Sequence, residues 1–185
     1  MRVIERYDMT VGLMAYPTAK DWMEVKRRAL VTIGKTPVTE PDEKWKRDML
    51  ECRHSPIRYL RFSFWLEIPY WVSVHLVRHR IDCQPYVSTQ RDDRQSVYAR
   101  GEAPQNAMIK MIWDVGGEEL LNIANKRLCS QASPETRQVV GMMCELVADA
   151  CPEFKDELVP ACVRNGGVCH ELHPCGRAKK EAEHE

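Results

Sequence analysis

Residues 60–68 alternate strictly between apolar and polar side chains, and this pattern constrains the fold more than any other. The apolar members of the alternation are Leu60, Phe62, Phe64, Leu66 and Ile68. Successive side chains of an extended chain point to opposite faces, so these five lie together on one face. One apolar face and one mixed face predict a half-buried strand of an antiparallel sheet.

The segments around this strand predict helices and shorter extended pieces. We expect helices over residues 19–32, 43–52, 70–77, 105–115, 118–131 and 134–150, and extended structure over 1–9 and 84–90. Asp42 and Ser133 stand where they can cap two of these helices. The predicted class is α+β, an antiparallel sheet packed with helices. Residues 1–155 would form the main domain, and 156–185 a C-terminal extension that contains Cys and His.

Composition excludes several classes of function. The 185 residues include 27 Lys and Arg against 27 Asp and Glu, and 44% are apolar. This apolar content suffices for a core, and the zero net charge gives no general attraction to nucleic acid or to an anionic membrane. No segment has a signal-peptide layout or approaches the ~20 apolar residues of a membrane helix, so we expect a cytoplasmic protein without nucleic-acid or membrane partners. Eight cysteines then predict reduced thiols or metal ligands rather than a disulfide framework.

Hydrogen-bond donors are concentrated between Pro69 and Arg94. Arg78 and Arg80 flank His79, so in a loop or extended conformation the two guanidiniums share a side and can grip a phosphate. The alternative is a solvated surface on which the arginines pair with local carboxylates. The residues by themselves also allow a metal pair at His75 and His79, four apart, although a partly buried histidine explains that spacing equally well.

Several short motifs follow one another in an order that is informative as a set. They are His54-Ser55-Pro56, Phe62-Ser63-Phe64, Pro69, Arg78-His79-Arg80-Ile81, Ser88, Trp113-Asp114-Val115, a helix with Leu120 and Asn122, and NKRLCSQASPETR at 125–137. This order resembles the flavin-dependent thymidylate synthase (ThyX) family, whose signature is RHR, then a serine, then a second serine followed two residues later by arginine. The resemblance covers residues 50–155, and its specific part is the RHR region.

The resemblance implies a homotetrameric enzyme that methylates deoxyuridylate (dUMP) to thymidylate (dTMP). In that family reduced FAD carries the one-carbon unit from methylenetetrahydrofolate to dUMP, and NADPH restores the flavin. The protein's own share is mostly positioning and electrostatics. We therefore expect FAD, NADPH, folate and dUMP as cofactors and substrates, and further copies of the chain as partners.

The resemblance also assigns residues to these ligands. The flavin contacts would be His54, Ser55, Arg78, His79, Arg80, Ile81 and Asn122, and the substrate contacts His75, Ser88, Gln90, Arg91 and Arg127. Ser88 and Arg127 carry the catalytic expectation. Ser88 would lie at the dUMP phosphate, and Arg127 would polarise the uracil, where a charged donor stabilises developing negative charge.

Some positions depart from the family pattern. They are His75 for a glutamine, Pro85-Tyr86 for an asparagine-glutamate pair, Gln90 for an arginine, and Gly116 and Glu118 for an asparagine and an arginine at the flavin. Arg91 stands one residue late, which turns a side chain to the opposite face of an extended chain. These changes leave the expected fold in place. They favour, as an alternative, a divergent protein that binds flavin or a nucleotide without synthase activity.

The C-terminal segment offers a second candidate site. Cys162, Cys169 and Cys175, with two histidines between them, could bind a structural zinc ion. Their spacing matches no compact zinc-finger pattern, so free thiols remain the alternative. A hypothesis from another class combines the two sites in a non-enzymatic module, in which the arginines grip nucleic acid or a partner's phosphates. Zero net charge and the lack of a basic, aromatic-interleaved strip count against it.

Overall fold

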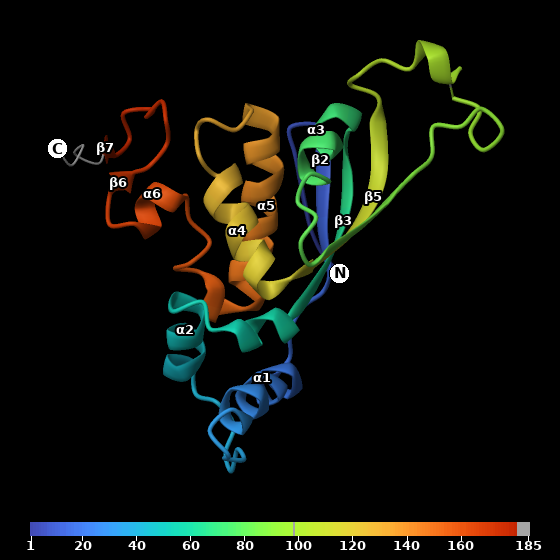
Figure 1. Cartoon of the computed structure of the whole chain (residues 1–185). Helices are drawn as coiled ribbons and strands as arrows, with labels where there is room; N and C mark the ends of the chain where they lie inside the picture. Colours follow the sequence, from blue (N-terminus) through green and yellow to red (C-terminus); the bar gives the residue numbers. More distant parts are fainter. Residues whose placement is uncertain (98, 181–185) are drawn as a thin grey trace.

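The core of the molecule is a five-stranded antiparallel sheet. The structure is a computed structural model that describes residues 1–97 and 99–180. Its strands are β1 (Arg2–Arg6), β2 (Met9–Ala15), β3 (Arg61–Pro69), β4 (Cys83–Val87) and β5 (Met108–Gly116). They lie in the order β1-β2-β3-β5-β4 with every neighbour antiparallel (Figure 1). The α+β class predicted from the sequence is confirmed.

The alternating segment forms β3, the central strand. Phe62, Phe64, Leu66 and Ile68 are buried, while the side chains between them are partly accessible. Strand β3 pairs with β2 on one side and with β5 on the other over its full length. The predicted half-buried strand is therefore correct, and its apolar face supplies the middle of the core.

Helices cover one face of the sheet and leave the other bare. They are α1 (Ala19–Val31), α2 (Glu43–Glu51), α3 (Tyr70–Leu76), α4 (Gly117–Arg127), α5 (Pro134–Ala150) and α6 (Ala161–Arg164). Helices α3, α4 and α5 pack on the same side of the sheet, and α1 and α2 lie at one end (Figure 1). Both predicted caps are present, because Asp42 accepts the N–H of Trp45 and Ser133 that of Thr136.

Two strand-forming segments were predicted wrongly. Residues 105–115, expected as a helix, form β5, whose Ile109, Met111, Trp113 and Val115 alternate into the core. Residues 1–9, expected as one strand, contain a hairpin turn at Tyr7 and Asp8. Both have positive φ, 58° and 59°, as a two-residue hairpin turn of the favoured handedness requires.

The remaining segments extend from this body. Short 3-10 helices cover Ser55–Tyr59 (η1), Arg100–Glu102 (η2) and Pro152–Phe154 (η3), and Val168–Cys169 (β6) pairs with Lys179–Lys180 (β7) in parallel. The C-terminal elements lie beyond α4, on its side away from the sheet (Figure 1). The segment between β4 and β5 projects away from the sheet. Within the described residues, no helix has the length and apolar character to cross a membrane.

Candidate functional site

A chain of polar side chains runs between the end of α3 and helix α4. His79 Nδ1 lies 3.0 Å from Oε1 of Glu119, and Nε of Arg127 donates to His79 Nε2 over 2.9 Å. Since Nε2 accepts that hydrogen bond, the proton of the neutral ring is on Nδ1 and is donated to the carboxylate. Glu119 also accepts Nδ2 of Asn122 at 3.1 Å. These contacts join four side chains from two elements, which we call the His79 cluster (His79, Glu119, Asn122 and Arg127).

His79 and Glu119 are the members of the cluster that are shielded from solvent. Only 12% of the His79 side chain and 10% of the Glu119 side chain are exposed. Burial of a carboxylate costs free energy unless it is hydrogen-bonded, and here His79 and Asn122 each contribute a donor to Glu119. The carboxylate in turn fixes the orientation of the imidazole, because its Nδ1–H has a single direction in which to donate.

Arg127 is the member of the cluster with unused donors. Its Nη2 donates to the carbonyl of His75 at 3.1 Å, and Nε is taken by His79. Burial, and then the nearby positive charge of Arg78, lower the pKa of Arg127 from its ordinary value. A guanidinium starts from so high a pKa that it stays charged. The cluster thus holds a half-buried cation beside a second one.

The RHR segment turns its members to opposite sides, as its alternation predicted. The ring of His79 points inward, whereas Arg78 and Arg80 are exposed and have no ion pair among the described residues. Ile81 follows with 78% of its surface exposed. It lines a pocket of about 270 Å³ together with Arg58, Asp82, Glu118, Glu119 and Asn122. The predicted flavin contacts Ile81 and Asn122 therefore meet at one pocket.

His54 and Ser55 lie at the start of η1, and both are exposed. Helix η1 packs against the first turn of α4, where the Gly117 N–H donates to Leu60 O at 2.9 Å. A Cβ at Gly117 would come within 2.8 Å of the Ile57 carbonyl, so the glycine permits this close approach. The same region carries the ion pair of Arg58 and Glu118, which lines the pocket beside Ile81.

His75 does not turn its ring toward the His79 cluster. Nδ1 of His75 lies 3.0 Å from the Thr136 hydroxyl of α5, and Trp71 meets the ring edge-on at a centroid distance of 5.5 Å. Only the backbone carbonyl of His75 reaches the cluster, through Arg127. The side chain therefore anchors α3 to α5, and the main chain of the same residue orients Arg127.

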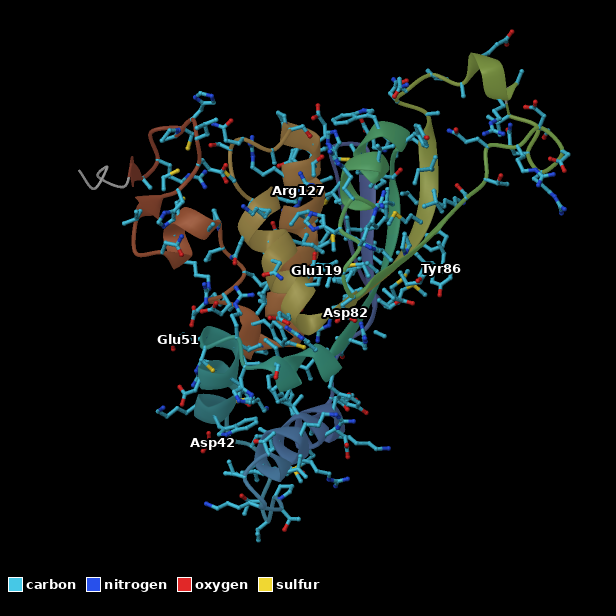
Figure 2. The ribbon with its side chains drawn as sticks, viewed as in Figure 1. Asp42, Glu51, Asp82, Tyr86, Glu119 and Arg127 are labelled. Carbon is cyan, nitrogen blue, oxygen red and sulfur yellow. The ribbon has the colours of Figure 1, made fainter. Side chains whose placement is uncertain are left out.

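The predicted phosphate-binding residues lie on the other side of the sheet edge. The Ser88 hydroxyl accepts the Lys110 N–H at 3.0 Å, which extends the pairing of β4 with β5. Arg91 makes a two-pronged ion pair with Asp93, at 2.9 and 2.7 Å, and Gln90 is half-buried nearby. Figure 2 shows Tyr86 of β4 well apart from Arg127 and Glu119 of α4. Within one chain the structure does not bring Ser88 and Arg91 to the His79 cluster.

Gly116, a departure from the family pattern, has a local explanation. A Cβ built at Gly116 would overlap Oδ2 of Asp82, whose backbone has a φ of 55° and whose other oxygen pairs with Arg61. The Gly116 N–H also donates to the Asp82 carbonyl at 2.9 Å. Oδ2 of Asp82 is buried and has no hydrogen-bond partner among the described residues. The turn after the RHR segment therefore depends on the absence of a side chain at the end of β5.

The C-terminal cysteines gather around a separate pocket of about 210 Å³. Cys162, Cys169 and Cys175 line it together with Cys129 of the segment after α4 and with His170. A hydrogen bond from Ser130 lowers the pKa of the exposed Cys175 thiol. Among the residues that the structure describes, no group of three His, Cys, Asp or Glu side chains is arranged to hold a metal ion. The zinc prediction therefore finds no support.

Sequence reasoning missed Glu119, Thr136 and Asp82. Glu119 follows Glu118 in the first turn of α4. Acidic residues are common in that position, so the pair did not indicate a functional site. The one available signal was the three-residue spacing of Glu119 and Asn122, which places both on the same helix face. Thr136 and Asp82 gave no signal, because each acquires its partner from another element.

Known proteins resemble this chain in its fold and in one segment of its sequence. Residues 95–153 match the family model described as thymidylate synthase complementing protein. No curated protein sequence matches the chain.

Two solved structures share the fold at low identity. One is a UMP/dUMP methylase PolB from Streptomyces cacaoi bound with 5-Br dUMP, with a TM-score of 0.66, 16% identity, and coverage of 82% of this chain and 95% of that one. The same protein bound with 5-Br UMP gives a TM-score of 0.62, 16% identity, and coverage of 82% and 94%. The match over residues 95–153 and the shared fold agree with the resemblance found in the sequence.

Proposed function

We propose that the protein is an FAD-dependent thymidylate synthase, which methylates dUMP to dTMP with methylenetetrahydrofolate. The observation that carries this proposal is the His79 cluster, which presents the half-buried cation of Arg127 beside Arg78. A preorganised charged donor in a water-poor site is what the negative charge developing on a uracil oxygen requires. The similarity to a methylase whose structures contain 5-Br dUMP and 5-Br UMP supports a pyrimidine nucleotide as the substrate.

The residues around Ile81 fit a flavin nucleotide. Arg78 and Arg80, which form no ion pair with the described part of the chain, offer guanidiniums for phosphates, and Ile81 offers an exposed apolar surface for a ring. The carboxylates that line the pocket already have partners, since Glu118 pairs with Arg58 and Glu119 with His79. The buried Oδ2 of Asp82 has no donor among the residues that the structure describes, and it suits an N–H of a ring. His54, Ser55 and Asn122 complete the proposed flavin contacts.

When bound, the flavin supplies the transfer of the one-carbon unit, with NADPH as the reductant. The chain's own residues bind and orient the reactants. Arg127 polarises the uracil, and His79 holds the guanidinium in place. Glu119 keeps the His79 proton on Nδ1, so that Nε2 remains an acceptor for Arg127. Ser88, Gln90, Arg91 and His75 are the proposed contacts of dUMP.

The proposed synthase requires assembly from several copies of the chain, because one chain separates Ser88 and Arg91 from the His79 cluster. The bare sheet face carries a row of side chains in register, Val3, Trp65, Ile112 and Tyr86. Of these, Val3 is 42% and Tyr86 57% exposed. An exposed apolar row of this kind is typical of a subunit interface. We propose a homotetramer in the cytoplasm, with each site shared between subunits.

An alternative function, flavin or nucleotide binding without synthesis, is favoured by one contact. Arg91 already makes two hydrogen bonds to the Asp93 carboxylate. To bind the dUMP phosphate, its guanidinium has to exchange that carboxylate for the phosphate. Protein that retains flavin but forms no dTMP would establish this alternative.

The experiment that tests the proposal combines two measurements on purified protein. The visible spectrum shows whether the protein carries flavin, and dTMP formation is measured from dUMP, methylenetetrahydrofolate, FAD and NADPH. The proposal expects both signals, and rescue of a bacterium that requires thymidine. Protein that is soluble and folded, yet has neither bound flavin nor dTMP formation with FAD added, would contradict it.

A further inference from the structure

A small polar pocket lies between α4 and the C-terminal extension, and it shares Asn122 with the His79 cluster. It has a volume of about 230 Å³ and is lined by Asn122, Asn125, Lys126, Ala161, Arg164 and Asn165. We call it the α4–α6 pocket. Its lining contains two cations and three amides and no carboxylate. A lining of this composition suits an anion, because its two cations and its amide N–H groups can donate hydrogen bonds to a ligand's negative charge.

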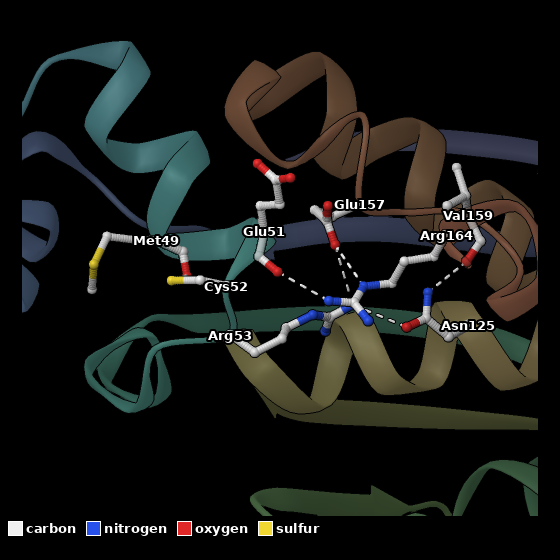
Figure 3. A network of polar contacts seen from close by, with 8 residues as sticks. All are labelled: Met49, Glu51, Cys52, Arg53, Asn125, Glu157, Val159 and Arg164. Atoms are coloured by element: carbon white, nitrogen blue, oxygen red, sulfur yellow. Dashed lines mark hydrogen bonds and ion pairs between the residues drawn. The ribbon is translucent and has the colours of Figure 1, made fainter. Parts of the chain in front are cut away.

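Two guanidiniums behind this pocket share a single carboxylate. Arg53 and Arg164 both contact Oε2 of Glu157, at 3.4 and 3.0 Å. Figure 3 shows the two guanidiniums side by side, with Arg164 also donating to the Glu51 carbonyl at 3.0 Å. Their mutual repulsion contributes, after burial, to a lowered pKa of Arg53. Within this group of three side chains, the two guanidiniums therefore carry one positive charge more than the carboxylate compensates.

Of the two guanidiniums, that of Arg164 belongs to the lining of the α4–α6 pocket. Side-chain exposure is 16% for Arg53, which has no hydrogen-bond partner for Nε or Nη1 among the described residues, and 33% for Arg164, which lines the pocket. Lys126 adds a second positive charge, and no described residue forms an ion pair with it. Acids line both adjoining pockets, Glu171 in the one that shares Lys126 and Asn165, and Glu118 and Glu119 in the one that shares Asn122. The two cationic side chains of the lining, Lys126 and Arg164, suit a phosphate group, which carries about −1.5 to −2 at neutral pH.

The amide side chains of the pocket are held in place to different degrees. Asn125 accepts from Arg53 at 2.9 Å and donates to the Val159 carbonyl at 2.6 Å, which ties α4 to the extension (Figure 3). Asn122 donates to Glu119 and so joins this pocket to the His79 cluster. Asn165 is exposed and makes no side-chain hydrogen bond with the described residues. It is the amide that a ligand can engage without breaking an existing contact.

We propose that the α4–α6 pocket binds the phosphate group of a small-molecule ligand, with Lys126 and Arg164 as its cationic contacts and Asn165 as a neutral donor. Arg164 is preorganised by Glu157 and the Glu51 carbonyl, so its remaining donors are presented at little cost in side-chain entropy. The site depends on the C-terminal extension for two of its three contacts. It does not depend on thymidylate synthesis.

Calorimetric titration with inorganic phosphate at constant ionic strength tests the site in the full-length protein. Phosphate can also bind at Arg78 and Arg80, so the comparison between variants shows which part of the measured binding occurs at the α4–α6 pocket. Lys126→Gln and Asn165→Ala are expected to weaken phosphate binding, the lysine change by about tenfold, since a charge-assisted contact is lost. Lys155→Gln, which removes an exposed charge elsewhere, and Arg80→Gln are expected to leave this component of the binding unchanged.

Adenosine monophosphate in a parallel titration distinguishes the two sources of the phosphate group. Equal affinity for both ligands identifies free phosphate, and tighter binding of the nucleotide, lost in Lys126→Gln, identifies a phosphorylated small molecule. Either result supports the site. Absence of phosphate binding, or binding that is unchanged in both Lys126→Gln and Asn165→Ala, overturns the proposal. Arg164 is left intact because its contacts to Glu157 and Glu51 also support the fold. A protein that binds phosphate here but makes no dTMP would refute the proposed synthase and not this site.

Discussion

Arg127 donates its Nε–H to Nε2 of His79 over 2.9 Å, so the guanidinium meets the unprotonated nitrogen of the ring. The opposite nitrogen of His79 lies 3.0 Å from Glu119. The Glu119 carboxylate therefore determines that Nε2 of the imidazole is the nitrogen free to accept a hydrogen bond. That nitrogen in turn orients the Arg127 guanidinium. Each of the three residues fixes the next, so their substitutions should have effects that are not additive.

Arg127→Ala should lower the rate of dTMP formation by about 10²–10³, the usual loss when one donor to a developing negative charge is removed. Flavin content should change little, because Arg127 is proposed to meet the uracil. Arg47→Ala removes an exposed arginine of α2 and serves as the control. A variant that retains most of the wild-type rate would show that Arg127 does not stabilise the transition state.

Glu119→Ala should destabilise the fold by about 1–3 kcal/mol, because it leaves the Nδ1–H of His79 without an acceptor in a shielded position. Glu119→Gln keeps an acceptor oxygen and should recover much of this loss. Urea unfolding followed by circular dichroism measures both free energies. Equal stabilities of the Ala and Gln variants would mean that the contact between His79 and Glu119 contributes nothing.

Gly116→Ala should destabilise the protein by about 1–3 kcal/mol, because the new Cβ overlaps the Asp82 carboxylate and forces the turn to shift. Asp82→Gly removes that carboxylate and suits the positive φ of 55° at this position. The double variant should therefore be more stable than the sum of the two single effects predicts. Simple additivity in the double-mutant cycle would exclude the steric conflict.

Thiol reactivity should separate the cysteines according to their surroundings. Burial raises the pKa of Cys144 and of Cys151 from 9.0 to about 12, whereas a hydrogen bond from Ser130 lowers the pKa of Cys175. Iodoacetamide at neutral pH should modify Cys175 well before Cys144, as mass spectrometry of the digested protein can determine. Cys52, which is exposed, provides the reference rate. Modification of Cys144 as fast as Cys52 in folded protein would contradict this order.

The raised thiol pKa values also predict a loss of stability in alkali. Between pH 9 and about pH 12 the unfolded chain releases these thiol protons while the folded protein keeps them. The unfolded state then binds fewer protons, so the free energy of unfolding falls as the pH rises through this range. Cys144→Ala should reduce the slope relative to wild type. A slope that stays the same in this variant would show that Cys144 ionises as readily in the folded protein as in the unfolded chain.

Ile112→Glu should disrupt assembly, because it places a charge in the middle of the exposed row on the bare sheet face. Light scattering after size-exclusion chromatography should then report a smaller species than the wild type, with the far-ultraviolet circular dichroism unchanged. Glu5→Gln, on the outer hairpin, controls for a change of charge. Wild-type protein that is monomeric at micromolar concentration would refute the proposed tetramer.

Local patterns alone determined several elements of this protein. The alternation in residues 60–68 settled the central strand, and Asp42 and Ser133 marked the starts of α2 and α5. The inward turn of His79 between two exposed arginines also followed from local alternation. These features are set by a residue and its near neighbours, so the sequence contains all that they require.

Local patterns failed where two periods fit the same residues. Met108, Met111, Ile112 and Val115 have helical spacing, whereas Ile109, Met111, Trp113 and Val115 alternate as in a strand. Pairing with β3 on one side and β4 on the other resolved the choice, since a strand in that position satisfies backbone groups of both neighbours. The β1–β2 hairpin was missed because its two-residue turn contains Tyr and Asp in place of the usual glycine.

Only the tertiary structure decided which of the candidate residues meet. The motifs named Arg127, His79 and Asn122, but their connection through Glu119 depends on α4 packing beside the end of α3. The same packing turned the His75 ring toward Thr136, and the sheet carried Ser88 and Arg91 to its far edge. The sequence determined which chemical groups are available. Their distances depend on long-range packing, which no local pattern encodes.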